Sequence, residues 1–215
     1  MSANHAAFNL IFRFVENYIS PIAGRISSQR HVMAIRDGFI SAMPFMIVGS
    51  FLLVFAYPPF SPDTTWGFAR AWLDLAKEFE GRILTPFDMT MGIMSIYICA
   101  AISYNLGKHY EKSNQLDPFM CAMLSIMAFL LIAAPKTNGT LPVDSLGGAG
   151  IFTAILVAIY CVEMMRFLKA HNIGIRLPDQ VPPMIKNSFD LLIPVLVVVL
   201  TLYPLSLFIQ HHFDM

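Results

Sequence analysis

The stretch LLIPVLVVVLTLYPLSLFI, residues 191–209, contains no charged side chain over 19 residues. An α-helix needs about 20 apolar residues to cross roughly 30 Å of hydrocarbon. Four earlier windows also lack Asp, Glu, Lys and Arg, and the five together predict spans at about 38–57, 89–107, 118–135, 146–162 and 191–210. Helix is the only choice, because a strand with an unpaired edge cannot lie in lipid. The sequence therefore predicts an all-α membrane protein with five transmembrane helices.

The composition also indicates that the bilayer is the solvent of this chain. Of its 215 residues, 56% are hydrophobic and 13% are charged, whereas a soluble domain has about 25% charged residues. The formal net charge is zero, so nothing suggests a nucleic-acid partner. Cys99, Cys121 and Cys161 each stand alone in an apolar run without metal or redox spacing, so we expect small core or lipid-facing residues.

The basic residues predict the orientation, because Lys and Arg of short loops stay in the cytoplasm. Ten of the 14 lie before the first span, between spans two and three, or between spans four and five, and the other two loops carry four. We therefore expect a multi-pass protein whose N-terminus is cytoplasmic and whose C-terminus, after five spans, is outside.

Two further segments have an amphipathic rather than a spanning pattern. Apolar residues between Phe8 and Ile19 repeat at helical spacing, and WGFARAWLDLAKEF, residues 66–79, does the same with two tryptophans. We expect interfacial amphipathic helices, the first on the cytoplasmic side and the second outside. Packing of either helix against the bundle explains the pattern equally well.

Small residues form a stripe in the fourth span. Gly150, Ala154 and Ala158 recur every four residues, and such a stripe lets another helix approach closely. These three residues are candidates for helix packing or for a dimer contact. The spacing does not decide between a contact inside one chain and a contact between two.

Ionisable residues inside a span point to function by default, but here they lie at the predicted span ends. Asp37, Asp88, Asp117 and Glu163 have this position, where we expect helix N-capping or interfacial solvation. An unrelated membrane enzyme is disfavoured, because the spans contain no ionisable pair.

No group of residues has the spacing of a catalytic, cofactor or metal site. His211 and His212 adjoin each other without a third ligand nearby, which favours a surface role over metal binding. The sequence lacks a Gly-rich phosphate loop, a Ser-His-Asp set and a Glu-x-x-His pattern. We expect no catalytic residues of its own, no cofactor and no metal.

A rigid segment precedes the last span. LPDQVPPMIKNSFDLLIP, residues 177–194, holds four prolines, and proline restricts both itself and the residue before it. We expect this connector to hold the fourth and fifth helices at fixed angles. Asp179, Pro182, Asn187 and Ser188 are its candidates for a substrate pathway or connector role.

The connector resembles a motif of the membrane (IIC) subunit of the lactose/cellobiose/diacetylchitobiose family of the bacterial sugar phosphotransferase system. The matching positions are Pro178, Asp179, Val181, Pro182, Ser188, Phe189, Leu192, Ile193 and Pro194. PIAGRISSQRHVMAIRDGFISAMPFMIVGSF, residues 21–51, is similar to the family's first cytoplasmic helix and first span. MTMGIMSIYICAAISYNLGKHY and GGAGIFTAILVAIYCVEMMRFL, residues 89–110 and 147–168, resemble its second and fourth spans, so that the resemblance covers residues 8–210.

The resemblance implies that residues 1–215 are the N-terminal half of a IIC permease domain, the half that acts as scaffold and dimer interface. Such a permease belongs to a phosphoenolpyruvate-dependent system in the bacterial inner membrane. It translocates a disaccharide of the cellobiose, chitobiose or lactose type, works with a soluble IIB phosphocarrier, and is a homodimer in contact with membrane lipid.

This sequence departs from the family's pattern in two ways. Asp190 stands where many relatives have a small residue. Relatives are also longer, with a second half whose re-entrant hairpins and Gly-Ile-His-Gly-type loop hold the sugar. We therefore expect a truncated or split product that does not transport alone. The alternative is a non-transporting membrane interaction protein that dimerises with full-length IIC subunits.

Overall fold

The computed structural model describes residues 16–17, 20–134, 142–175, 180, 182, 185 and 189–213. Within these ranges every regular element is a helix, in agreement with the predicted all-α class. The α-helices are α2 (Ser20–Ser27), α3 (Arg30–Ala56), α4 (Gly67–Phe87), α5 (Met94–Asn114), α6 (Pro118–Ala133), α7 (Ile151–Ala170) and α9 (Leu192–Phe213). A π-helical turn, Asp88–Gly92, links α4 to α5, and a 3₁₀ turn, Gly148–Gly150, precedes α7.

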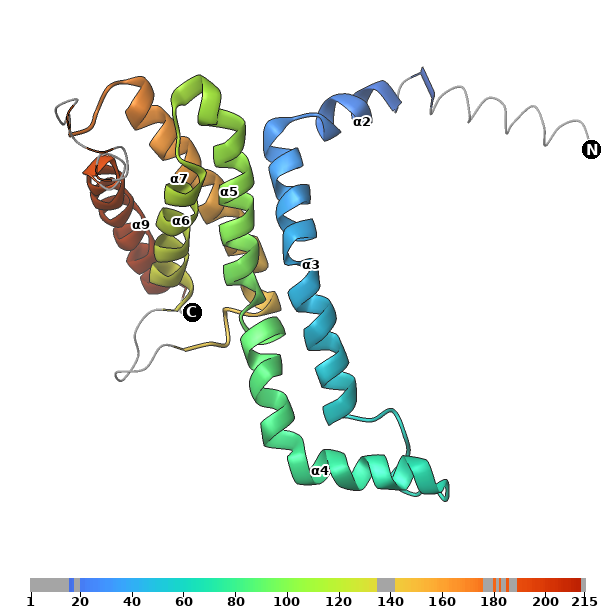
Figure 1. The fold of residues 1–215 in the computed structure, drawn as a ribbon. Coiled ribbons are helices and arrows are strands. Elements are labelled where there is room, and N and C mark those ends of the chain that lie inside the picture. Colours follow the sequence, from blue (N-terminus) through green and yellow to red (C-terminus); the bar gives the residue numbers. More distant parts are fainter. Residues whose placement is uncertain are drawn as a thin grey trace, which may run out of the picture.

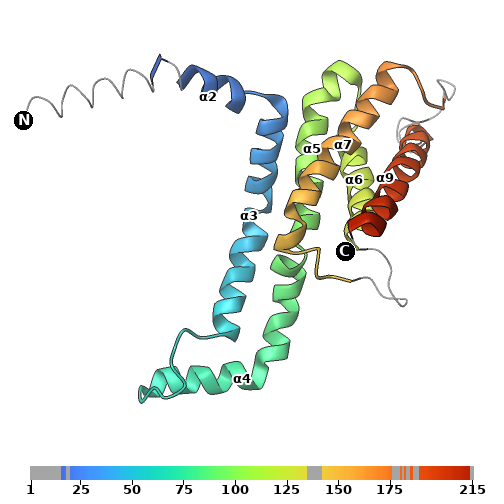
Figure 2. The ribbon, with the colours of Figure 1, turned by 180° about the vertical axis from the view of Figure 1, so that it is seen from behind.

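The helices α5, α6, α7 and α9 stand side by side as a bundle, and α3 runs along one side of it (Figures 1 and 2). At the lower end in Figure 1, α4 crosses beneath α3, and the chain then rises through the π-helical turn into α5. Helix α5 is central, because it packs against α3, α6 and α7. Its buried side chains Ile98, Ile102 and Leu106 belong to one apolar core shared by these helices.

Small residues allow α3 to approach α5 closely. Ala34, Gly38 and Ala42, four residues apart, are all buried on one face of α3. A Cβ atom added to Gly38 would collide with the side chain of Ile102 and lie 2.9 Å from its backbone nitrogen. Only glycine fits there, which is how helices gain contact in lipid without a hydrophobic driving force between them.

The predicted spans match the observed helices in order but not in length. Helix α3 begins at Arg30 rather than near Gly38, and α7 continues to Ala170. The predicted second span is interrupted, since α5 begins only at Met94, after the π-helical turn, and ends at Asn114. A charge-free window marks where hydrocarbon is expected, whereas the backbone hydrogen bonds of a helix continue into the polar layer.

Among the described residues, three helical stretches are long and apolar enough to cross a membrane, namely Arg30–Ala56, Gly67–Asn114 and Gly148–Ala170. Pro118–Ala133 and Leu192–Phe208 are shorter apolar helices. The all-helical membrane architecture is thus clear, and the count of five spans stays a prediction.

The segment predicted to be an outer amphipathic helix is helical, as α4 begins at Gly67. Its Trp72 donates its indole N–H to the Phe55 carbonyl at 3.2 Å, and aromatic rings from both sides of the turn gather around it. This contact fixes α4 to the end of α3. The other amphipathic segment, Phe8 to Ile19, lies outside the described residues except for residues 16–17.

Candidate functional site

Polar side chains from three helices meet at the end of the molecule that is uppermost in Figure 1. Glu163 of α7 accepts a hydrogen bond from the Tyr110 hydroxyl of α5 at 2.8 Å through Oε1. The same oxygen lies 2.9 Å from His31 Nε2 of α3, and Oε2 lies 2.8 Å from Arg166 Nε. One carboxylate therefore joins α3, α5 and α7.

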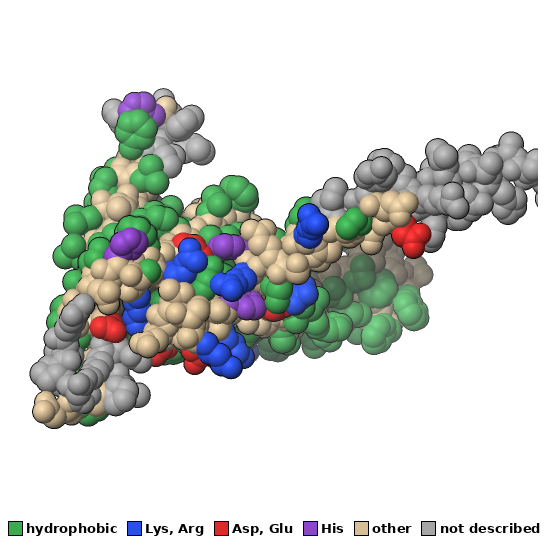
Figure 3. Space-filling view, turned by 90° about the horizontal axis from the view of Figure 1, so that it is seen from above, with side chains coloured by type: hydrophobic (Ala, Val, Ile, Leu, Met, Phe, Trp, Pro, Cys, Tyr) green, Lys and Arg blue, Asp and Glu red, His purple; other side chains and the backbone are tan. Residues whose placement is uncertain are grey.

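Two cations flank the ring of Tyr110. The guanidinium of Arg166 lies 4.8 Å from the ring centroid and that of Arg30 lies 5.5 Å from it, both within cation–π range. We call Arg30, His31, Tyr110, Glu163 and Arg166 the Glu163 cluster. Figure 3 looks onto this end and shows basic, acidic and histidine side chains gathered over the bundle.

The Glu163 cluster is shielded but not sealed from solvent. Tyr110 is 2% exposed, whereas the side chains of Glu163, His31 and Arg166 are 25%, 32% and 43% exposed. A carboxylate that accepts from a hydroxyl, an imidazole and a guanidinium has most of its lone pairs occupied. Its chemistry suits positioning of helices better than proton transfer to a substrate.

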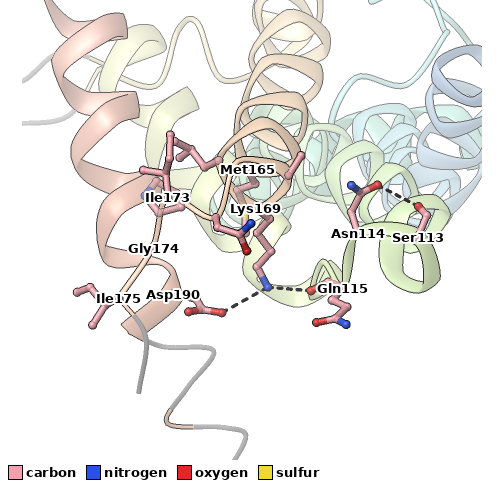
Figure 4. A pocket seen from close by; sticks show the side chains of 13 residues that line it. Ser113, Asn114, Gln115, Met165, Lys169, Ile173, Gly174, Ile175 and Asp190 are labelled. Carbon is pink, nitrogen blue, oxygen red and sulfur yellow. Dashed lines mark hydrogen bonds and ion pairs between the residues drawn. The ribbon is translucent and has the colours of Figure 1, made fainter. Parts of the chain in front are cut away.

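A pocket of about 600 Å³ opens beside this cluster, between the ends of α5 and α7 and the start of α9 (Figure 4). Lys169 of α7 reaches across it. Its Nζ donates to the backbone carbonyl of Gln115 at 2.8 Å and lies 3.4 Å from Asp190 Oδ2. Asp190, the residue at which this sequence departs from the family's pattern, is thus partly exposed and has a basic partner.

The predicted connector residues lie mostly beyond what the structure describes. Asp179, Asn187 and Ser188 are outside the described residues, and Pro182 is described and exposed. The role given to these four stays a prediction. The described part of the connector meets the pocket through Asp190 and Pro194.

The small-residue stripe of α7 faces inward. Gly150, Ala154 and Ala158 are all buried within the single chain. A Cβ on Gly150 would collide with the backbone oxygen of Ser145, so this glycine permits the tight turn into α7. Ser95 of α5 donates to the nearby Gly147 carbonyl, which ties this turn to the start of α5.

Helix N-capping or interfacial solvation was expected for four acidic residues, and N-capping is observed at one of them. Asp117 Oδ1 accepts from the backbone N–H groups of Phe119 at 2.9 Å and Met120 at 3.3 Å, as an N-cap does. Glu163 lies inside α7 and caps no helix, so interfacial solvation is the expected role that stays a prediction for it. Asp37 lies inside α3 and pairs with the neighbouring Arg36, so it is not a cap either.

The last of the four acidic residues, Asp88, does not N-cap a helix either; its backbone N–H instead ends α4 as the C-cap. It begins the π-helical turn, where no side-chain capping hydrogen bond forms.

The histidines near the C-terminal end of α9 were expected to have a surface role rather than to bind metal. Of these, His212 has its Nδ1 atom 3.2 Å from the carbonyl oxygen of Phe208. No three His, Cys, Asp or Glu side chains come together as metal ligands within the described ranges.

The Glu163 cluster was missed because its members come from three distant segments. Glu163 and Arg166 are three residues apart on one helix, a spacing that does indicate an ion pair. Their partners, His31 and Tyr110, lie 132 and 53 residues from Glu163 along the chain. No local pattern links such positions.

Residues 36–214 match the family described as "Phosphotransferase system, EIIC". Among curated proteins, the PTS system cellobiose-specific EIIC component of Geobacillus stearothermophilus is 35% identical over 206 residues, which is 87% of this chain and 43% of that protein. The PTS system lactose-specific EIICB component of Streptococcus mutans is 33% identical over 196 residues, covering 88% of this chain and 33% of that protein.

A solved structure has a similar fold. The crystal structure of the transporter ChbC, the IIC component from the N,N'-diacetylchitobiose-specific phosphotransferase system, aligns with a TM-score of 0.75 and 33% identity. The alignment covers 93% of this chain and 47% of that one. The chain thus spans about half the length, or less, of these proteins.

Proposed function

The chain belongs to the EIIC family of the phosphotransferase system, and on that premise we propose that it supplies the scaffold of a membrane permease for a disaccharide. The proposed sugar is of the cellobiose, chitobiose or lactose type, since the similar proteins are named for these sugars. The observation that carries the proposal is the shared fold at 33% identity over 93% of the chain.

In this proposal the five apolar helices α3, α5, α6, α7 and α9 all cross the inner membrane. The Glu163 cluster and the Lys169 pocket then lie on the cytoplasmic side, with the N-terminus, and α4 lies at the outer surface. The two shorter helices can cross if the bilayer thins slightly around them, which costs fractions of a kcal/mol per ångström. A set of reporter fusions after residues 62, 116, 140, 174 and 212 tests this topology. The fusions at 116 and 174 should report cytoplasm and the other three the outside.

We place the scaffold role in residues 1–215 as a whole, with the sugar held by the portion of an EIIC protein that this chain does not match. Burial of Gly150, Ala154 and Ala158 within one chain supports an internal packing role for this stripe. A homodimer would then use other surfaces, such as the exposed apolar side chains of α3, among them Ile40, Ile47 and Phe51. Phosphoryl transfer from phosphoenolpyruvate would reach the sugar through a soluble IIB partner.

The proposal is tested by complementation in cells that lack their own permeases for these disaccharides. The chain alone should give no phosphorylated disaccharide. Coexpression with the C-terminal part of the Geobacillus cellobiose EIIC should restore uptake of labelled cellobiose. The two halves of the Geobacillus protein, expressed separately, serve as the matched control. Uptake by the chain alone would contradict the scaffold role, as would failure of the mixed pair where the control pair succeeds.

A further inference from the structure

Two helix ends with the same backbone conformation build the pocket beside Lys169. Gln115 ends α5 with a φ of 53° and Asn172 follows α7 with a φ of 54°, both in the left-handed region. At α7 the turn is a Schellman motif, in which Asn172 N–H donates to the Lys169 carbonyl at 3.1 Å and Ile173 N–H to the Leu168 carbonyl at 2.9 Å. The pocket wall is therefore fixed by how the two helices terminate.

The charges around the pocket are paired only in part. Helices α5 and α7 both end at the pocket, and helix C-termini favour cations. Lys169 supplies one cation, yet its Nζ lies 3.4 Å from Asp190 Oδ2, beyond the usual N–H···O range of about 2.7–3.2 Å. An ammonium has three donors and a carboxylate accepts several hydrogen bonds. Both groups thus retain capacity for a ligand that carries one positive and one negative charge.

The depth of the pocket also restricts its ligand. It lies where the apolar part of α7 ends and where the charge-free helix α9 begins, two residues after Asp190. Ile173 and Ile175, 46% and 38% exposed, give it an apolar edge together with Pro194. With the helices crossing the bilayer as proposed above, such a site, polar inside and apolar at its edge, would lie at the level where lipid headgroups meet their acyl chains.

We propose that this pocket binds the headgroup of an ethanolamine phospholipid. The lipid ammonium would donate to Asp190 and to the C-terminal carbonyls, and the phosphate would accept from Lys169. The acyl chains would lie along Ile173, Ile175 and Pro194. An anionic headgroup fits less well, because it would meet Asp190 and two helix C-termini. A choline headgroup has no N–H to donate.

Native mass spectrometry of the purified chain in detergent, titrated with phospholipids of equal acyl composition, tests the proposal. Phosphatidylethanolamine should be retained roughly tenfold better than phosphatidylcholine or phosphatidylglycerol, the ratio that one charge-assisted hydrogen bond gives. Equal retention of the three lipids by the wild-type chain would overturn the proposal, and this comparison needs no variant to fold.

Variants locate the site. Asp190→Asn and Lys169→Met should each reduce phosphatidylethanolamine retention about tenfold, on the same basis. Lys112→Met is the matched control, since Lys112 is an exposed basic residue in the last turn of α5 that does not line the pocket. The assignment would be contradicted if Lys112→Met lost as much phosphatidylethanolamine retention as the pocket variants. It would also be contradicted if neither pocket variant lost retention while its helical circular dichroism stayed unchanged. Displacement of the lipid by comparable concentrations of soluble phosphoethanolamine would show a soluble-ligand site instead and also overturn it.

Discussion

Replacement of Glu163 by alanine should loosen the contact between α3, α5 and α7. The change leaves the nearly buried Tyr110 hydroxyl without its acceptor, which costs about 1–3 kcal/mol. His31 and Arg166 are 32% and 43% exposed, so water can replace much of what they lose. Each of those two pairs is therefore worth only about 0–1 kcal/mol. With the middle of each range, the expected total is about 3 kcal/mol.

Glu163→Gln separates the hydrogen bond from the charge. Its amide oxygen can still accept from Tyr110, so this variant should lose only the ion-pair part, about 1 kcal/mol. Thermal unfolding in one fixed detergent provides the measurement. A loss of 1 kcal/mol lowers Tm by about 2–4 °C for a chain of this size. Glu163→Ala should then melt about 6–12 °C below wild type, and Glu163→Gln about 2–4 °C below it.

Glu111→Ala is the matched control, because Glu111 is an exposed glutamate that directly follows Tyr110 on α5. The reasoning fails if Glu163→Ala melts with the control, or if Glu163→Gln is as unstable as Glu163→Ala. Tyr110→Phe combined with Glu163→Ala completes a double-mutant cycle. Its coupling energy should be favourable and close to the difference between the alanine and glutamine variants.

Three further changes probe other parts of the fold. Gly38→Ala should destabilise by about 1–3 kcal/mol, since its Cβ would meet the backbone of α5, whereas Gly24→Ala, in open space, should not; equal melting temperatures would refute the close approach. Asp117→Ala should cost about 1 kcal/mol through loss of the N-cap, and Asp117→Asn much less, again read from thermal unfolding. The hydrogen bond to the Glu80 carboxylate raises the pKa of Tyr57, so this contact should hold at neutral pH and be lost only as the pH rises through that raised value. The difference in phenolate absorbance between wild type and Tyr57→Phe isolates the signal of Tyr57. That signal should appear above pH about 10, and its appearance at or below this pH would contradict the contact.

The sequence predicted the helical class and the order of the helices because both depend on local composition. A run such as residues 191–209 has few alternatives in lipid. Asp117 followed by proline is likewise a local cap signal, and the structure confirms it. Helix ends were predicted less well. Hydropathy changes at the edge of the hydrocarbon, near Gly38, whereas α3 already begins at Arg30, eight residues earlier.

Contacts between helices were the part that the sequence could not supply. Ala34, Gly38 and Ala42 have the same four-residue spacing as the stripe noticed in α7, yet only the structure shows which helix they meet. Nor could it show that Glu163 bonds to α3 and α5. Both contacts depend on how distant segments are arranged, and sequence spacing within one helix does not encode this.

The two kinds of interhelix contact follow from the solvent at each depth. In hydrocarbon, lipid tails compete with apolar side chains, so helices gain most where small residues such as Gly38 bring backbones together. At the helix ends water is present, polar groups are tolerated, and one carboxylate can collect donors from three helices. Because Ala34 lies only three residues after His31 on α3, the first close contact and the Glu163 cluster hold the same end of that helix.

Loss of the cluster should therefore release α3 from the upper end of the bundle while the contact of Gly49 with the π-helical turn still holds its lower half. Hydrogen exchange should then rise near residues 30–38 of Glu163→Ala and stay unchanged near Gly49; a uniform rise along α3 would show that the two contacts are not separable.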